Sequence, residues 1–146
     1  MPLRRTRSAG YMTNWAARLF ARAIDRRLKL TGVSSGHLPV FFALGDGAAL
    51  SQKALTEAAA IEQPTMAATL TRMERDGLIA RRPDPQDGRS SLISLTQQAM
   101  EKMPAVRAAI AAVNAEALAG LSEAEAEAFL EGLATVVANL EMPATL

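Results

Sequence analysis

Cysteine is absent from this sequence of 146 residues, which excludes disulfides, thiolate metal ligands and thiol redox sensing. A single histidine, His37, leaves almost no imidazole for a zinc or iron site. No apolar run reaches membrane-spanning length, and the basic N-terminus lacks the apolar stretch of a signal peptide. We therefore expect a cytoplasmic protein that has no cofactor and no membrane partner.

Aromatic residues are also scarce, at 4%, whereas alanine is abundant and apolar residues reach 49%. That balance favours helix over sheet, and the length suits one domain. The net charge is only +1, but it is unevenly spread. Residues 1–100 carry 14 Lys or Arg against 8 Asp or Glu, and residues 101–146 carry 2 against 7. This asymmetry suits a polyanion partner, or is an ordinary drift of surface charge.

Hydrophobic periodicity and end signals predict a mainly helical chain. Helices are expected over about residues 9–30, 37–47, 52–60, 64–77, 96–119 and 122–141. Ser51 and Thr96 are suited to cap helices, Pro104 is expected to bend one, and Ser122 with Glu125 forms a capping box. Leu78–Arg82 and Leu92–Leu95 are expected to form two short strands.

The stretch between these strands, "PDPQDGRSS", predicts a stiff hairpin tip. Proline restrains it and Gly88 permits a turn, while Arg81, Arg82 and Arg89 supply cations. Asp87 can pair with Arg89 and hold it extended. Such an arginine is attracted most strongly by a narrow A·T-rich minor groove, and arginines along the strand suit phosphates.

Two short helices, a tight turn and this hairpin give the order of a winged helix-turn-helix. In the helix expected over residues 64–77, Met66, Leu70 and Met73 share one face. We predict that the opposite face reads DNA, with Gln63 capping the helix next to phosphate. The candidate DNA-binding residues are Gln63, Thr65, Ala68, Thr69, Arg72, Arg81, Arg82, Asp87 and Arg89.

Residues 50–96 resemble the DNA-binding core of the MarR family (multiple antibiotic resistance regulators). The family pattern LExxGLIxRRxDxxDxR stands here as "MERDGLIARRPDPQDGR", followed by "LT". The resemblance implies one MarR-like domain over residues 1–146. Within it, a winged helix-turn-helix, about residues 34–96, is flanked by dimerisation helices, about residues 9–31 and 97–141.

The same resemblance implies a transcriptional regulator, expected to be a repressor. It would bind pseudo-palindromic double-stranded DNA as a homodimer and be released by a small, often aromatic, acid. Two departures from the family pattern suggest modest affinity or more reliance on DNA shape. Ala67 and Ala68 stand where many members have a hydroxyl residue and an arginine, and Gly88 replaces a frequent basic residue.

Apolar stripes along the chain's two ends give more apolar helical surface than one small winged helix can cover. We therefore predict that this surface is buried between two copies of the chain. These stripes are Trp15 to Leu28; Val106, Ile110 and Val113; and Phe129, Leu130, Leu133, Val136, Val137 and Leu140. A patch this large would be unusual on a monomer.

Several residues and functions keep two interpretations. Trp15, His37 and Phe41 either line an effector pocket or only pack and cap. An enzyme is not expected, because the sequence has a single histidine and shows neither a Ser–His–Asp arrangement nor a Gly-rich phosphate loop. The alternative function is a winged-helix module that binds proteins without sequence-specific DNA binding.

Overall fold

The computed structural model describes residues 1–141 as six α-helices, two 3₁₀ turns and one antiparallel hairpin. The helices are α1 (Ala9–Arg27), α2 (Leu38–Leu44), α3 (Gln52–Ala59), α4 (Gln63–Arg75), α5 (Gln97–Ala117) and α6 (Glu123–Glu141); the strands are β1 (Ile79–Asp84) and β2 (Asp87–Leu95). The predicted class, mainly α with a small β-hairpin, is confirmed. The chain forms two compact units that divide after Val113, within α5.

A tight joint connects α3 to α4. Ser51 caps α3, because its hydroxyl accepts a hydrogen bond from the Ala54 N–H at 3.1 Å. The chain then leaves α3 through Ala60, whose φ of 53° lies in the left-handed region. Only two residues separate Ala60 from the first residue of α4, so this backbone angle sets the direction of the second helix.

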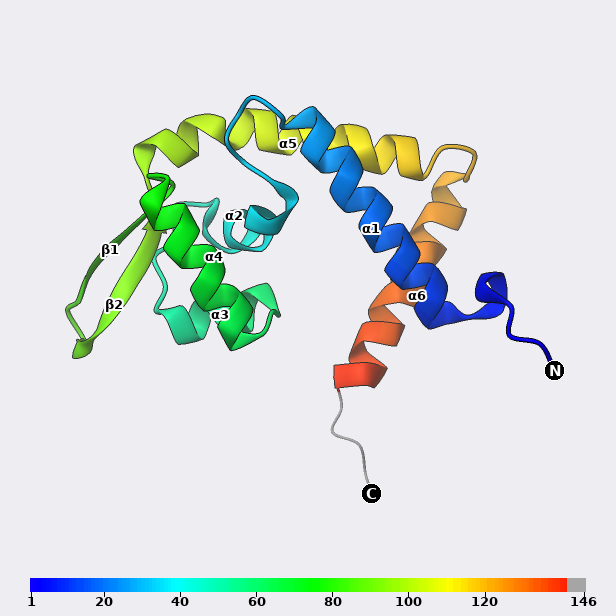
Figure 1. Ribbon diagram of the computed structural model, residues 1–146, viewed down its shortest axis with the longest axis horizontal. Helices are drawn as coiled ribbons and strands as arrows, with labels where there is room; N and C mark the ends of the chain where they lie inside the picture. Colours follow the sequence, from blue (N-terminus) through cyan, green and yellow to red (C-terminus); the bar gives the residue numbers. More distant parts are fainter. Residues whose placement is uncertain (142–146) are drawn as a thin grey trace, which may run out of the picture. The chain divides into compact units, whose positions relative to one another are not determined.

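Gly77 ends α4 and turns the chain into the hairpin. Its φ of 75° is one that glycine adopts without strain. The strands pair from Ile79 opposite Leu95 to Pro83 opposite Ser91, with a bulge after Pro83. They are longer than predicted, because pairing continues through the charged stretch to Asp84 opposite Asp87. Figure 1 shows the hairpin projecting beside α4, in the manner of a wing.

The core of the first unit is shared by the helices and the base of the hairpin. Its fully buried members include Leu28, Val40, Phe41, Leu44, Leu55, Met66, Leu70, Met73, Leu78, Ile93 and Val106. Thr96 caps α5 as predicted, and its hydroxyl also donates to the Gly77 carbonyl at 2.6 Å. The end of α4 and the start of α5 are therefore fixed to each other.

One predicted interface stripe is instead core. Val106 and Val113 of α5 belong to the chain's own buried core, together with Ile24 and Leu28 of α1. The prediction that the Val106–Val113 stripe serves dimer formation is therefore wrong for these two side chains. They are already covered by apolar partners within one chain.

The second unit contains α6, which begins with the predicted capping box. The Ser122 N–H donates to the Glu125 carboxylate at 2.9 Å, and the Glu125 N–H donates to the Ser122 hydroxyl at 3.1 Å. The pKa of Glu125 is lowered, because the backbone N–H of Ser122 and the Ser122 side chain both stabilise its ionised carboxylate. None of the helices described in residues 1–141 is long and apolar enough to cross a membrane.

Candidate DNA-binding surface

The outer face of α4 is small and polar. Thr65, Ala68 and Arg72 are exposed along one side, whereas Met66, Leu70 and Met73 are buried in the core. These positions agree with the sequence prediction for both groups of three. A face without bulk can approach base edges closely, and an exposed guanidinium can offer paired donors to guanine or to phosphate.

Thr69 does not belong to this outer face. It is only 3% exposed, so the prediction that Thr69 lies on the exposed side is wrong. At 3.6 residues per turn, Thr69 lies about 60° around the helix from Met66, within the arc that faces the core.

Two exposed residues that the sequence reasoning missed are Thr71 and Arg75, the last helical residue of α4. The Thr71 hydroxyl donates to the Ala67 carbonyl at 2.9 Å, and the Arg75 Nε lies 3.1 Å from the Asp76 carboxylate. The helical angle alone could have placed both residues on the outer side.

Gln63 is not the N-cap of α4. The N-cap is Glu62, which makes no side-chain capping bond, and Gln63 is the first helical residue, with Pro64 next to it. Both Gln63 and Thr65 are exposed at this end of the helix. Gln63 therefore remains available at the helix N-terminus, where backbone N–H groups attract anions.

Two aspartates organise the tip of the wing. The Asp84 carboxylate accepts a hydrogen bond from the Gln86 N–H at 2.8 Å, and the Asp87 carboxylate accepts one from the Arg89 N–H at 3.0 Å. Each is an aspartate bonding the backbone two residues on, a pattern that favours tight turns. The partnership predicted between Asp87 and Arg89 thus involves the Arg89 backbone. The Arg89 side chain is exposed at the start of β2.

Arg81 and Arg82 are neighbours in β1, so their side chains leave opposite faces of the hairpin. Arg81 turns toward the helices: its Nε lies 3.4 Å from the Glu74 carboxylate of α4, and its Nη1 lies 3.4 Å from the Gln52 side-chain oxygen of α3. Arg82 is exposed and stands opposite Leu92 in the pairing register. The two arginines, predicted as a similar pair, therefore have different surroundings.

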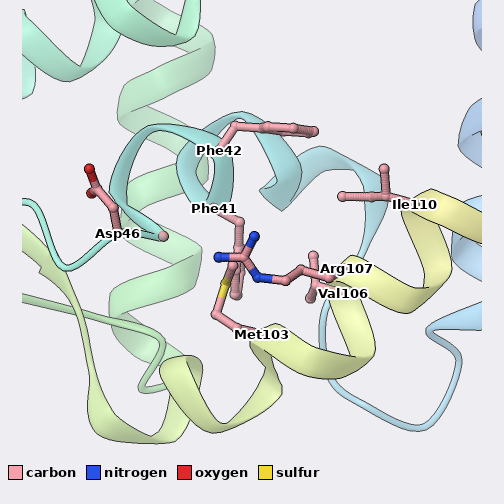
Figure 2. A pocket seen from close by; sticks show the side chains of 8 residues that line it. Phe41, Phe42, Asp46, Met103, Val106, Arg107 and Ile110 are labelled. Carbon is pink, nitrogen blue, oxygen red and sulfur yellow. The ribbon is translucent and has the colours of Figure 1, made fainter.

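A hollow of about 270 Å³ lies between α2 and α5. Its lining combines apolar side chains with two charged ones, the anion Asp46 and the cation Arg107; the lining residues are Phe41, Phe42, Gly45, Asp46, Met103, Val106, Arg107 and Ile110. Figure 2 shows the Arg107 side chain reaching from α5 toward α2, close to Met103 and Phe41. Phe41 lines this hollow but is also packed in the core, at 2% exposed, so its role in an effector pocket stays a prediction. A metal ion has no such place in residues 1–141, where no cluster of three acidic or histidine side chains is suited to hold one.

Trp15 and His37 have other contacts. The Trp15 ring meets Tyr11 edge-on and lies under the Arg5 guanidinium, 4.7 Å from the ring centroid. His37 Nδ1 accepts a hydrogen bond from the Ser34 N–H at 3.2 Å, which is a capping role. Burial lowers the pKa of His37; Asp76 opposes this shift, Arg72 adds to it and Asp25 opposes it.

Comparison with known proteins agrees with this geometry. A family model described as "MarR family" matches residues 31–90, which include α2, α3, α4, β1 and the tip of the wing. A Bacillus subtilis (strain 168) protein, the uncharacterized HTH-type transcriptional regulator YwoH, is 29% identical over 119 residues, covering 82% of this chain and 86% of the relative. Over residues 31–90, the chain is similar to the MarR family. This similarity and the winged-helix geometry together support a role in DNA binding and transcription regulation.

Solved structures extend the likeness over the rest of the chain. The PcaV transcriptional regulator from Streptomyces coelicolor, in complex with its natural ligand, is 24% identical with a TM-score of 0.87 and covers 97% of this chain and 99% of its own. The S. aureus MepR–DNA complex is 25% identical with a TM-score of 0.80 and covers 92% of this chain and 99% of its own. The flanking helices therefore belong to the shared fold as much as the winged helix-turn-helix does.

Proposed function

We propose that this chain is a cytoplasmic repressor of the MarR family that binds pseudo-palindromic double-stranded DNA as a homodimer, and that it is not an enzyme. The observation that carries the proposal is the pairing of two exposed surfaces, the outer face of α4 and the cationic wing tip. One has the size for a major groove, and the other presents an arginine to the adjacent minor groove. We place the winged helix-turn-helix at about residues 34–96 and dimerisation at the two ends.

The residue roles follow from position. Gln63 and the N-terminus of α4 would contact phosphate, and so would Arg82. The base edges would be contacted by Thr65, Ala68 and Arg72. Asp87 would hold the tip while Arg89 enters the minor groove. Arg89 carries most of this wing function, because its backbone is fixed by Asp87 and its side chain is exposed.

The decisive experiment is binding of the operator by the Arg89→Ala variant. We expect the loss of one minor-groove arginine to weaken binding by about 1–3 kcal/mol, with the thermal unfolding of the protein unchanged. Fluorescence anisotropy at moderate salt measures this, with Arg4→Ala in the N-terminal segment as a charge-matched control. Equal operator affinity for Arg89→Ala and the parent would contradict the wing assignment.

Salt dependence separates DNA binding from the alternative of a protein-interaction module. Phosphate contacts release counterions, so the logarithm of the binding constant should fall steeply with the logarithm of salt concentration. A chain that retains no operator DNA at low salt would favour the interaction module.

We further propose release by a small aromatic carboxylate bound in the hollow between α2 and α5. The apolar side chains of Phe41 and Met103 suit a ring, and Arg107 suits a carboxylate. PcaV, whose structure holds its natural ligand, supports a ligand site in a protein of this fold.

Titration of the operator complex with a panel of aromatic carboxylates tests this release. We expect Arg107→Gln to raise the concentration needed for release by roughly tenfold or more, because a charge-assisted hydrogen bond is lost. The operator affinity of the ligand-free variant should stay at the parent value. If the Arg107→Gln variant leaves the operator at the same carboxylate concentration as the parent, this hollow is excluded as the ligand site.

A further inference from the structure

Arg81 is the one candidate DNA-binding arginine of the wing for which the structure shows side-chain contacts to two helices. Its guanidinium reaches the Glu74 carboxylate in the last turn of α4 and the Gln52 oxygen at the first residue of α3, each at 3.4 Å. The pair with Glu74 is only partly open to solvent, with 30% of the Arg81 side chain and 49% of the Glu74 side chain exposed. One side chain therefore joins β1 to both helices of the helix-turn-helix.

The backbone strengthens this junction from the other strand. Arg81 pairs with Ile93 across the hairpin, and Ile93 in turn exchanges two backbone hydrogen bonds with Leu50, at 2.7 and 3.0 Å. Leu50 lies two residues before Gln52. The side-chain contacts of Arg81 and the backbone bridge of Ile93 thus connect the same segment of the wing to the start of α3.

We propose that Arg81 is a positioning residue for DNA binding: it fixes the wing relative to α3 and α4, so that α4 and Arg89 reach their grooves together. The inference rests on the proposed function and changes one role within it, because Arg81 was predicted to contact phosphate. Its positive charge is already partnered by Glu74, which lowers what it would gain from a phosphate. Arg82, which leaves the opposite face of β1, keeps the phosphate role.

The two roles differ in their salt dependence. Removing a phosphate contact lowers the slope of log K against log salt by roughly 1 for each chain bound. Removing a positioning contact weakens binding and leaves that slope unchanged. We expect Arg81→Ala to lose roughly two- to fivefold in operator affinity with the parent slope, as fits a partly exposed ion pair. Arg82→Ala, the matched control, should lose affinity and slope together.

Arg81→Lys sharpens the test, because lysine keeps the charge but lacks the planar fork that reaches two partners. A positioning role predicts that Arg81→Lys binds about as weakly as Arg81→Ala, and a phosphate role predicts that lysine restores binding. Thermal unfolding of each variant is measured alongside. A lower unfolding temperature with parent affinity would show a purely structural residue and overturn the proposal.

A double-mutant cycle with Glu74→Gln completes the experiment. If Arg81 acts through Glu74, the substitution Arg81→Ala should cost less affinity in the Glu74→Gln background than in the parent. An equal or larger cost there, or a reduced salt slope for Arg81→Ala, would overturn the proposal. Neither result would affect the proposed DNA binding itself, which Arg89→Ala and the parent slope test separately.

Discussion

At the scale of single residues, aspartate and alanine decide the geometry of the two surfaces more than the arginines do. Asp84 and Asp87 each bind the backbone N–H two residues on, and so shape the tip from which Arg89 extends. Ala60 holds the left-handed angle at the joint between α3 and α4. The arginines supply charge, but these short residues determine where that charge is presented.

Ala60 offers a direct test of backbone strain at this joint. The left-handed conformation costs an L-residue about 1–2 kcal/mol, and glycine avoids this cost. Part of the gain is offset, because glycine also raises the conformational entropy of the unfolded chain. We expect Ala60→Gly to raise the free energy of unfolding by roughly 0.5–1 kcal/mol. Denaturant unfolding measures this, with operator affinity retained because the direction of α4 is unchanged.

Ala58→Gly is the matched control for Ala60→Gly. Ala58 lies within α3 and is exposed, so glycine there should destabilise the protein by roughly 0.5–1 kcal/mol. A loss of stability for Ala60→Gly similar to that of Ala58→Gly would show that the left-handed angle stores no strain.

At the scale of elements, the capping signals in the sequence predicted the helix ends well. The hydrophobic pattern predicted the buried and exposed faces of the helices less well. Ser51, Thr96 and the Ser122–Glu125 box cap the helices that they were expected to cap, because capping depends on neighbours three residues away. Thr69 was placed on the wrong side, because a polar residue at the edge of a helical face is buried or exposed by what packs against it. That depends on tertiary contacts.

Charged residues in the hairpin show a second limit of sequence reasoning. Arg81 and Arg82 are identical in type and adjacent, yet only the long-range position of Gln52 and Glu74 distinguishes them. The strands also extend further than predicted, because backbone pairing tolerates Pro83 on this two-stranded hairpin. Local pattern predicted the wing but not the partners of its side chains.

The α4 element carries a prediction about base readout. Arg72 lies on its exposed side, so Arg72→Ala should relax base preference at one position of each half-site, a discrimination of about 1–3 kcal/mol. Selection of binding sites from random DNA measures this change. Thr69→Ala, which alters a buried residue, should lower stability and leave the selected sequence unchanged.

Arg82→Ala is the control for this selection, since a phosphate contact carries no sequence information. It should weaken binding to all sequences alike. Recovery of the parent's motif by Arg72→Ala would show that Arg72 does not read bases.

At the scale of the whole molecule, apolar residues at the two ends of the chain remain uncovered. Those of α6 include Phe129, Leu130, Val136, Val137 and Leu140, the last 81% exposed. On α1, Tyr11, Met12 and Leu19 are exposed as well. Unlike Val106 and Val113, none of these is buried in the chain's own core. Exposed apolar residues of this kind on each helix are what an obligate interface would bury.

We therefore expect operator binding to require a dimer built from the chain's ends. A single recognition helix with Ala68 at its centre should bind one half-site weakly, whereas two copies would read half-sites roughly 34–36 Å apart. Truncation after Gly120 removes α6 and should give monomer or aggregate with operator affinity lost, although residues 50–96 are untouched. Analytical ultracentrifugation and anisotropy measure the two effects.

A milder pair of variants distinguishes loss of the interface from loss of folding. Val137→Asp places a charge among the exposed apolar residues of α6, and Thr135→Asp places the same charge beside them. We expect Val137→Asp to dissociate the dimer at micromolar concentration and weaken operator binding by about tenfold or more, because an isologous interface meets the charge twice. Thr135→Asp should remain dimeric and bind as the parent does. A full-length chain that sediments as a monomer at micromolar concentration, and still binds operator, would show that one winged helix suffices.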